Sequence, residues 1–539
     1  MQAKIQASSG VWRKQIRTMT KAQPPVKLND PEQEVEVKFS CDPVIFPRVL
    51  KLSQPTILSA TQLKQLQSTY FDTADWRLHN AGVCLRLRSD EAEKSIWCIK
   101  SPGWGANSTF GRNQFEVPAL GVQPDLGQFG PDLARQLSQI IGRHEIAPRF
   151  SISVRRHSLL LRHLSSQLEI TMDAGEVSGG SSREEFTEIE LELKSGHERH
   201  LIDFAMLLLQ QLPLTLNFVT KADRGFGLVT RCPARWKAAK LCPATTNLNF
   251  SQILARAISS ALEHFTRNWA ALLGAFEPEA THQLRIALRR FRDLTGFYGD
   301  TFPLPDFGNL RKRAKTIGKA LGSARSLDVL LKSLSTFKAL PHINLQALAT
   351  LHVHVEQHHA RAYENVRDVI RDRASSQFVL EAQDLILQCE EIHRPAGTAA
   401  VEAAAFVKTQ SDEILARLHK AILKRGSGLS KLSNKQLHSL RLKVKVMRHA
   451  TSTFPEIADA KLKVAHYERS LARFQKVLGN HNDNIFALRF LRSHSKDQPT
   501  EVKSCVKHLL REIRRRDKLE LGKLKVAWKT FRGSEPYWR

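Results

Sequence analysis

The chain has 539 residues, which is too long for a single hydrophobic core and predicts two to four domains. A hydrophobic content of 42% and a mean hydropathy of −0.31 indicate a folded, soluble protein. The longest apolar region, around residues 205–216, is interrupted by glutamines and a proline, which argues against a membrane span. Seven scattered cysteines form no close metal-type pair, which predicts a reducing compartment and a cytoplasmic protein.

The net charge of +28 is unevenly distributed along the chain. Residues 1–33 carry a net charge of +4, residues 34–230 carry −2, and residues 231–539 carry +26. An excess of this sign attracts polyanions such as nucleic acid, polyphosphate or an anionic membrane surface. The first segment is basic and lacks an apolar signal core, so we expect residues 1–33 to form a disordered arm.

Residue patterns divide the remainder of the chain into two domains of different class. Residues 34–230 are mostly strand-like, whereas residues 248–539 show apolar residues every three to four positions, which is typical of helices. Residues 231–247 contain two prolines and little periodicity, which predicts a linker.

Two strand-like stretches of the first domain alternate charged and apolar residues. Glu34, Glu36 and Lys38 share one face of the first stretch, while Val35 and Val37 share the other. The second stretch, 188–194, repeats the pattern with three carboxylates and a lysine. One such stretch alone would be an ordinary solvated face. Two of them predict a sheet with a charged lining, suited to a phosphate chain chelated by a divalent cation.

The order of these motifs resembles the CYTH domain of the triphosphate tunnel metalloenzymes. This resemblance implies a closed antiparallel barrel of eight strands, with a charged lumen and helices covering the outside. The chain departs from the family at Gln114, where a carboxylate often stands, although Glu116 occupies the next inward position. The matching elements are Glu34-x-Glu36-x-Lys38, Tyr70-Phe71-Asp72-Thr73, Leu85-Arg86-Leu87-Arg88, Lys100, Arg112, Arg156, the 188–194 strand and Lys221-x-x-Arg224-Gly225.

The resemblance implies metal-dependent hydrolysis of inorganic triphosphate, with Glu34, Glu36 and Lys38 as the catalytic group. One Mg²⁺ or Mn²⁺ ion would neutralise the phosphate chain, and a second would position and acidify the attacking water. The predicted metal ligands are Glu34, Glu36, Glu188, Glu190 and Glu192. The predicted substrate-binding cations are Lys38, Arg86, Arg88, Lys100, Arg112, Arg156, Lys194, Lys221 and Arg224.

The helical half contains an internal repeat with two basic stripes. A histidine and three cations recur at i, i+3, i+7 and i+10, and at 100° per residue these positions form one continuous face of a helix. A Leu-Gly pair follows each histidine, at 321–322 and 478–479. We therefore predict a duplicated four-helix unit with halves at about 248–390 and 400–539. The two stripes are His282, Arg285, Arg289 and Arg292, and His438, Arg441, Lys445 and Arg448.

These stripes and Leu-Gly pairs resemble the CHAD domain, an all-helical module associated with polyphosphate binding. The resemblance covers residues 248–539 and implies that both stripes contact polyphosphate. It also implies that the protein associates with polyphosphate granules. The plainer alternative for His282 and His438 is a role in helix packing.

Three other functions stay open at this stage. A weakened barrel, suggested by Gln114, would make the protein a non-catalytic polyphosphate binder. The same fold could act on a nucleoside or thiamine triphosphate, or perform cyclase chemistry, but the sequence shows no aromatic pair for stacking a base. Nucleic-acid binding by the basic half is a weaker alternative, because no aromatic residues are interleaved with the cations.

Overall fold

A computed structural model describes residues 32–51, 56–60, 63–92, 94–102, 110–230, 236–239, 249–274, 277–301, 307–391, 400–454 and 461–538. The predicted arm (1–33) and linker (231–247) lie outside these residues, apart from residues 32 and 33 of the arm, which begin the first strand, and residues 236–239 of the linker. The chain divides near residue 234 into two compact units, which are described separately below.

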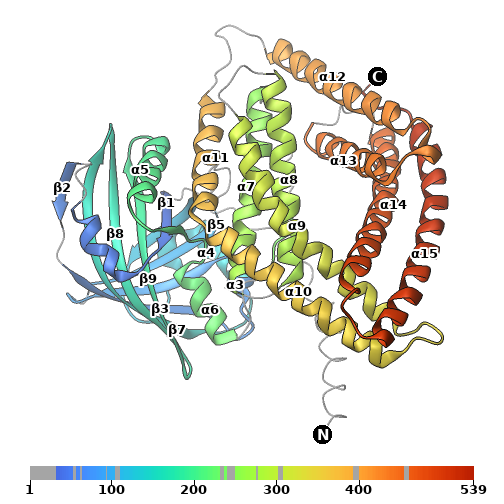
Figure 1. Cartoon of the computed structure of the whole chain (residues 1–539). Helices are drawn as coiled ribbons and strands as arrows, with labels where there is room; N and C mark the ends of the chain where they lie inside the picture. The colour runs from blue at the N-terminus through green and yellow to red at the C-terminus, as the bar shows by residue number, and fades with distance from the viewer. Residues whose placement is uncertain are drawn as a thin grey trace. The chain divides into compact units, whose positions relative to one another are not determined.

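The first unit is a closed barrel of eight antiparallel strands, which confirms the predicted fold (Figure 1). Neighbouring strands follow the order β1-β6-β5-β4-β3-β7-β8-β9, and β9 pairs with β1 to close the ring. Two short strands lie outside this ring: β2 (Thr56–Ala60) pairs with β7, and β10 (Thr215–Leu216) pairs with β1. The ring strands are β1 (Glu32–Ser40), β3 (Lys64–Thr73), β4 (Cys84–Asp90), β5 (Ser95–Pro102), β6 (Gly111–Pro118), β7 (Ile146–His163), β8 (Ser166–Gly179) and β9 (Ser182–Ser195).

The barrel is apolar outside and polar inside because its strands alternate residue type and helices cover its outer face. Helix α5 (Glu198–Gln211) packs against β1, β7, β8 and β9, and α4 (Pro131–Ile141) packs against Leu85, Trp97 and Ile99. Burying each such side chain stabilises the fold by roughly 1.5–3 kcal/mol. The inward faces are therefore free to carry charge. Short helical segments connect the strands: α2 (Phe46–Val49), α3 (Arg77–Asn80) and 3₁₀ turns at Pro43–Ile45 and Leu126–Phe129.

Helix α6 (Lys221–Thr230) packs against inward-facing residues of the barrel. Its Phe226 forms an apolar cluster with Tyr70 and Phe150, whose rings stack at 4.6 Å. Gly225 is required for this close approach, because a Cβ atom there would lie 2.0 Å from the Phe150 ring. The packing places Lys221, the first residue of α6, beside the acidic residues of β8 and β9.

The second unit is helical throughout its described residues, as predicted, apart from its connecting loops. In the first half α7, α8, α9 and α10 pack in sequence, and in the second half α12, α13, α14 and α15 repeat this arrangement. The first half has one additional helix, α11, which packs against α7 and α9. The helices are α7 (Phe250–Gly274), α8 (Pro278–Thr301), α9 (Phe307–Phe337), α10 (Leu345–Arg371), α11 (Arg373–Glu391), α12 (Ala400–Gly426), α13 (Asn434–Thr451), α14 (Lys461–His494) and α15 (Thr500–Arg532), with a 3₁₀ turn at Leu429–Lys431.

The two helical halves share a core and form one body. Leu334 of α9 and Val355 of α10 belong to the same buried cluster as Leu491 of α14 and Leu509 of α15. Helices α8 and α13 are also in contact, and His449 of α13 bonds to Asp293 of α8 at 2.7 Å. Within the described part of the chain, no helix has both the length and the apolar character that crossing a bilayer requires.

Candidate active site and polyanion site

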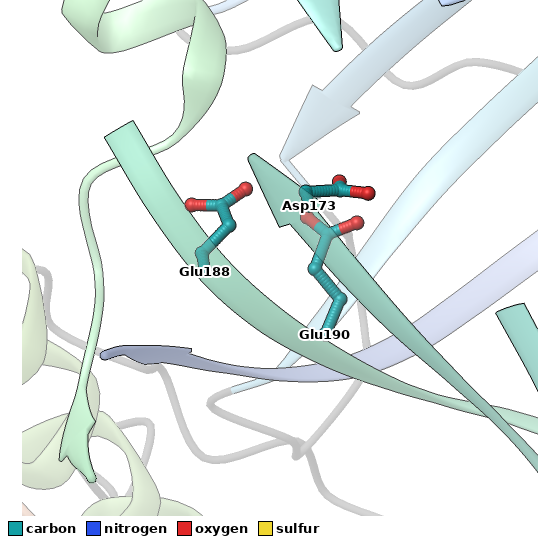
Figure 2. Close-up of side chains that lie close together, drawn as sticks. All are labelled: Asp173, Glu188 and Glu190. Atoms are coloured by element: carbon teal, nitrogen blue, oxygen red, sulfur yellow. The ribbon is translucent and has the colours of Figure 1, made fainter. Parts of the chain in front are cut away.

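Three buried carboxylates converge inside the barrel (Figure 2). Glu188 and Glu190 lie two residues apart on β9, and Asp173 lies opposite Glu188 on β8. One carboxylate oxygen from each residue lies within 4.8 Å of the others. We call these three residues the acidic triad. Three hard oxygen donors at this separation fit a divalent cation such as Mg²⁺ or Mn²⁺.

The pairing of β8 with β9 explains why Asp173 belongs to the triad although the sequence analysis did not include it. The two strands form a hairpin, and its last pair, Gly179 with Ser182, encloses a tight two-residue turn in which Gly180 has a φ of 58°. The turn sets the register, which brings Asp173 opposite Glu188. The two consecutive glycines were the signal in the sequence that could have identified this hairpin and its acidic pair.

Three cations surround the acidic triad and balance its charge. The Lys221 ammonium lies 2.9 Å from carboxylate oxygens of both Asp173 and Glu190 and also contacts Glu188. The Arg156 guanidinium donates to Asp173 at 2.7 and 2.5 Å and to Glu190 at 2.9 Å. Lys38 of β1 bonds to Glu190. Thus three predicted substrate-binding cations and two predicted metal ligands do come together at one place in the lumen.

The surroundings of the three triad carboxylates shift their pKa values in different directions. Burial raises the pKa of Glu190, but Lys221, Lys38 and Arg156 outweigh it and hold that pKa well below its usual value. Burial raises the pKa of Glu188 by more than Lys221 lowers it, so this pKa lies above its usual value. Burial raises the pKa of Asp173 too, but Lys221 and Arg156 lower it overall. Glu188 is therefore the triad member that takes up a proton most readily.

The other predicted metal ligands lie outside the triad. Glu34 accepts two bonds from Lys100, at 2.7 and 2.5 Å. Glu36 lies 3.0 Å from Lys38 and 3.5 Å from Arg112. Burial raises the Glu36 pKa, but the cations Lys38, Lys100 and Arg112 outweigh it and lower this pKa to about 2, so the carboxylate stays ionised. Glu36 therefore lies between Arg112 of β6 and Lys38, and Lys38 in turn contacts the triad.

The third carboxylate of the β9 acidic stretch, Glu192, is half-buried and lies near the end of the strand, where residues 194 and 195 are exposed. It accepts a bond from Lys194 at 2.7 Å, and Lys194 also contacts Glu169 at 3.0 Å. The Lys194 side chain is 38% exposed, unlike Lys38 and Lys221, which are buried. The structure therefore separates Lys194 from the cations that contact the acidic triad.

The remaining predicted cations contact a carboxylate or, in the case of Arg86, the Tyr70 side chain. Arg88 pairs at 3.3 Å with Glu116, the carboxylate two residues after Gln114. Gln114 lies opposite Lys100, and its side-chain oxygen is buried without a hydrogen-bond partner among the described residues. The Nε of Arg86 likewise lacks a described partner. Arg224 pairs with Glu184 at 2.6 Å.

The two basic stripes of the helical unit form a single cluster. Arg285 and Arg289 of α8 face Arg441 and Lys445 of α13, close enough for each charge to disfavour the others. We call these four residues the basic cluster, and none of them lies within ion-pair distance of a carboxylate among the described residues. Asp483 favours the charged forms of Arg285, Arg441 and Lys445, and Asp293 favours that of Arg289. Burial and the three arginines nevertheless lower the pKa of Lys445 to about 6, and burial and its neighbours lower that of Arg285 to about 10. Half-buried cations that outnumber the nearby carboxylates are typical of a site for an external anion.

The glycines of the two Leu-Gly pairs lie beside arginines of the basic cluster. A Cβ atom at Gly322 of α9 would lie 3.9 Å from the guanidinium carbon of Arg285, and one at Gly479 of α14 would lie 3.9 Å from Nε of Arg441. The Gly322 carbonyl also accepts a long bond from Arg285 at 3.4 Å. A Cβ atom at either glycine would make only ordinary van der Waals contact, so these distances show that the two arginines occupy equivalent places in the two halves.

The ends of the stripes have different surroundings. Burial and the neighbouring Arg325 lower the pKa of His282, which faces the basic cluster. Arg292 has a buried Nε without a described hydrogen-bond partner. His438 is exposed and its Nδ1 bonds to the Asn482 side-chain oxygen at 2.7 Å, while Arg448 is exposed. The basic cluster is thus the buried centre of a longer basic face.

Comparison with known proteins agrees with both folds. The sequence profile of the CYTH domain matches residues 32–226, and that of the CHAD domain matches residues 256–492. An inorganic triphosphatase from Haemophilus influenzae is 28% identical over 197 residues, which is 36% of this chain. The match covers 54% of that relative, so the chain spans about half of its length.

Similar solved structures include a CHAD domain and a protein described as an adenylyl cyclase with triphosphatase activity. The CHAD domain from the plant Ricinus communis is 22% identical, with a TM-score of 0.48, and the match covers 56% of this chain and 98% of that one. A Hippeastrum protein described as having a dominant triphosphatase activity is 17% identical, with a TM-score of 0.26, and the match covers 36% of this chain and 94% of that one.

Proposed function

Because the chain carries a CYTH domain at 32–226 and a CHAD domain at 256–492, we propose that its barrel hydrolyses inorganic triphosphate to diphosphate and phosphate. The observation that carries the proposal is the acidic triad, which lies buried among Lys38, Arg156 and Lys221. A lumen with three carboxylates and three cations can accept both a divalent cation and the phosphate chain that the cation chelates.

Asp173, Glu188 and Glu190 would hold a Mg²⁺ or Mn²⁺ ion, and Glu34, Glu36 and Glu192 are further carboxylates along the lumen for a second ion. The metal supplies charge neutralisation of the phosphate chain and activation of water. If the triad carboxylates bound a metal instead of Lys38, Arg156 and Lys221, these three cations would be free to donate hydrogen bonds to phosphoryl oxygens. Arg86, which hydrogen-bonds the Tyr70 side chain rather than a carboxylate, would be available to the substrate without this exchange.

Glu188 would act as a metal ligand, and the proton of the attacking water would pass to solvent. Without a metal, burial raises the pKa of Glu188, and a bound cation would lower that pKa and keep the carboxylate ionised. Asn217 and Lys221 hold it in place, the former by a bond of 3.2 Å. Water adds to the terminal phosphorus, the bridging oxygen leaves with diphosphate, and the cationic side chains stabilise the charge that develops on that oxygen.

We further propose that the basic cluster binds polyphosphate. Arg285, Arg289, Arg441 and Lys445 are half-buried on two facing helices, and a phosphate chain would supply more negative charge than Asp293 and Asp483 provide. Arginine suits this role because its planar guanidinium can donate two bonds to one phosphate group.

Release of phosphate from tripolyphosphate by the full chain tests the enzymatic proposal. We expect turnover with Mg²⁺ or Mn²⁺, none after chelation of the metal, and a loss of at least about a hundredfold in Glu190→Gln. Glu185→Gln is the matched control, because Glu185 lies on the same strand but is exposed, and it should retain activity.

The result also separates the alternatives. Folded protein that turns over no tripolyphosphate with either metal would contradict the proposal and favour a non-catalytic polyphosphate binder. Faster turnover of a nucleoside or thiamine triphosphate than of tripolyphosphate would assign a different substrate to the same lumen.

A further inference from the structure

Three histidines gather in the helical unit, apart from the acidic triad and the residues of the basic stripes. His354 and His358 lie four residues apart on α10, and His494 is the last residue of α14. The ring centroids of His354 and His358 are 4.9 Å apart, those of His358 and His494 are 4.5 Å apart, and those of His354 and His494 are 6.5 Å apart.

We propose that His354, His358 and His494 form a binding site for a divalent transition-metal ion such as Zn²⁺. Nitrogen–zinc distances of about 2.1 Å in tetrahedral geometry place the centroids of ligating imidazoles roughly 5 Å apart. The three observed separations, 4.5–6.5 Å, lie around this value, and binding would require the side chains to rotate until one nitrogen of each ring reaches the same ion. Because His354 and His358 are four residues apart, their rings project from the same face of α10.

The hydrogen bonds of these rings leave nitrogens available for an ion. Nδ1 of His494 lies 3.0 Å from the Phe490 carbonyl, a bond that fixes the ring and leaves its Nε2 for a metal. Nε2 of His354 is buried and has no hydrogen-bond partner among the described residues. Nδ1 of His354 lies 3.3 Å from the Gln498 side-chain amide. Rotating that amide by 180° would let it accept from Nδ1 and leave Nε2 as a metal ligand.

The local charge also favours metal binding over protonation. Burial and the neighbouring His494 and His354 lower the pKa of His358, so the ring is neutral, as a metal ligand must be, at neutral pH. Imidazole nitrogens select zinc, copper or nickel over magnesium and calcium, which prefer oxygen. This site would therefore take a different class of ion from the acidic triad. Because α10 belongs to the first half and α14 to the second, the ion would join the two halves.

Zn²⁺ titration of the full chain, prepared free of metal and held in excess Mg²⁺ to occupy oxygen-ligand sites, tests the proposal. We expect about one Zn²⁺ per chain and a rise in the melting temperature that Mg²⁺ alone does not produce. His358→Gln and His494→Gln should each weaken Zn²⁺ binding by more than about tenfold. His352→Gln is the matched control, because His352 lies on α10 but pairs with Glu356, and it should bind Zn²⁺ normally.

A second measurement does not depend on the variants. Co²⁺ added to the unmodified protein under the same conditions should give the intense visible absorption of a tetrahedral site with nitrogen ligands. Weak absorption typical of octahedral oxygen coordination would overturn the proposal. Zn²⁺ binding that persists unchanged in both His358→Gln and His494→Gln would overturn it as well.

Discussion

The barrel lumen and the basic cluster both bury cations that could bind phosphate, but they balance the charge differently. In the lumen, Lys38, Arg156 and Lys221 each contact at least one carboxylate. In the helical unit, Arg285, Arg289 and Arg441 form no ion pair among the described residues, and Lys445, with a pKa of about 6, is mostly neutral at pH 7. The first site is nearly neutral before a ligand binds, whereas the second carries an excess of positive charge on its three arginines that Asp293 and Asp483 offset only in part.

This difference predicts different requirements for binding. In the lumen an anion must displace carboxylates from the cations, which a divalent cation makes feasible by engaging those carboxylates. In the basic cluster an anion relieves repulsion directly, so binding needs no metal but weakens steeply with salt. The same contrast predicts opposite effects on stability when a cation is removed.

The largest effect should come from removing one lysine in each site. Lys38→Met leaves the buried Glu36 and Glu190 carboxylates without this partner and should destabilise the barrel by roughly 3–5 kcal/mol. Lys445→Met replaces a lysine whose charged form is disfavoured in the basic cluster and should change stability by less than about 1 kcal/mol, or raise it. Urea unfolding of the two variants decides the matter. Equal losses in both would mean that the two sites do not differ in charge balance.

Catalysis should depend on the cation that contacts the whole acidic triad. Lys221→Met should lower tripolyphosphate turnover by about a hundredfold to a thousandfold, because Lys221 contacts Asp173, Glu188 and Glu190. Lys94→Met, an exposed change in the same barrel, should retain activity. Steady-state phosphate release measures both. Near-normal turnover by folded Lys221→Met would remove the acidic triad from the mechanism.

Polyphosphate binding should depend on charge from both halves of the repeat. Arg289→Glu and Arg441→Glu should each weaken binding of long-chain polyphosphate by about tenfold to a hundredfold, because each loses charge-assisted bonds and adds repulsion. Lys435→Glu, an exposed reversal on α13, should have a much smaller effect. Competition with DNA of equal charge at fixed salt distinguishes the ligands. If DNA displaces polyphosphate, the basic cluster is a general polyanion site.

The smallest expected effect is a pH dependence that only the helical site should show. Lys445 has a pKa of about 6 in the free protein, and a bound phosphate chain would raise it. Above pH 6 binding then takes up a proton, so polyphosphate affinity should fall by about tenfold from pH 6 to pH 8.

A permanently charged residue at this position provides the control for the pH dependence. Lys445→Arg should flatten the profile, measured in a His282→Gln background because His282 also faces the cluster and titrates. A slope that persists in Lys445→Arg would assign the proton to another group.

Local sequence patterns determined the fold class and the faces of the elements. Alternation in a strand has period 2 and a helix turns every 3.6 residues, so Glu34, Glu36 and Lys38 were correctly placed on one face of β1, as were Glu188 and Glu190 on β9. The stripe containing Arg285 and Arg289 was likewise visible, because its spacing depends only on the helix that carries it. These properties need no knowledge of which elements are neighbours.

Only the tertiary structure decided which charged faces meet. The register of the β8–β9 hairpin added Asp173 to the acidic triad, and the pairing of Glu34 with Lys100 kept that carboxylate apart from it. The packing of α8 on α13 merged two stripes into one basic cluster and lowered the pKa of Lys445. Register and helix packing depend on contacts between residues far apart in the chain, and the free energy of a buried charge depends on all of its neighbours at once.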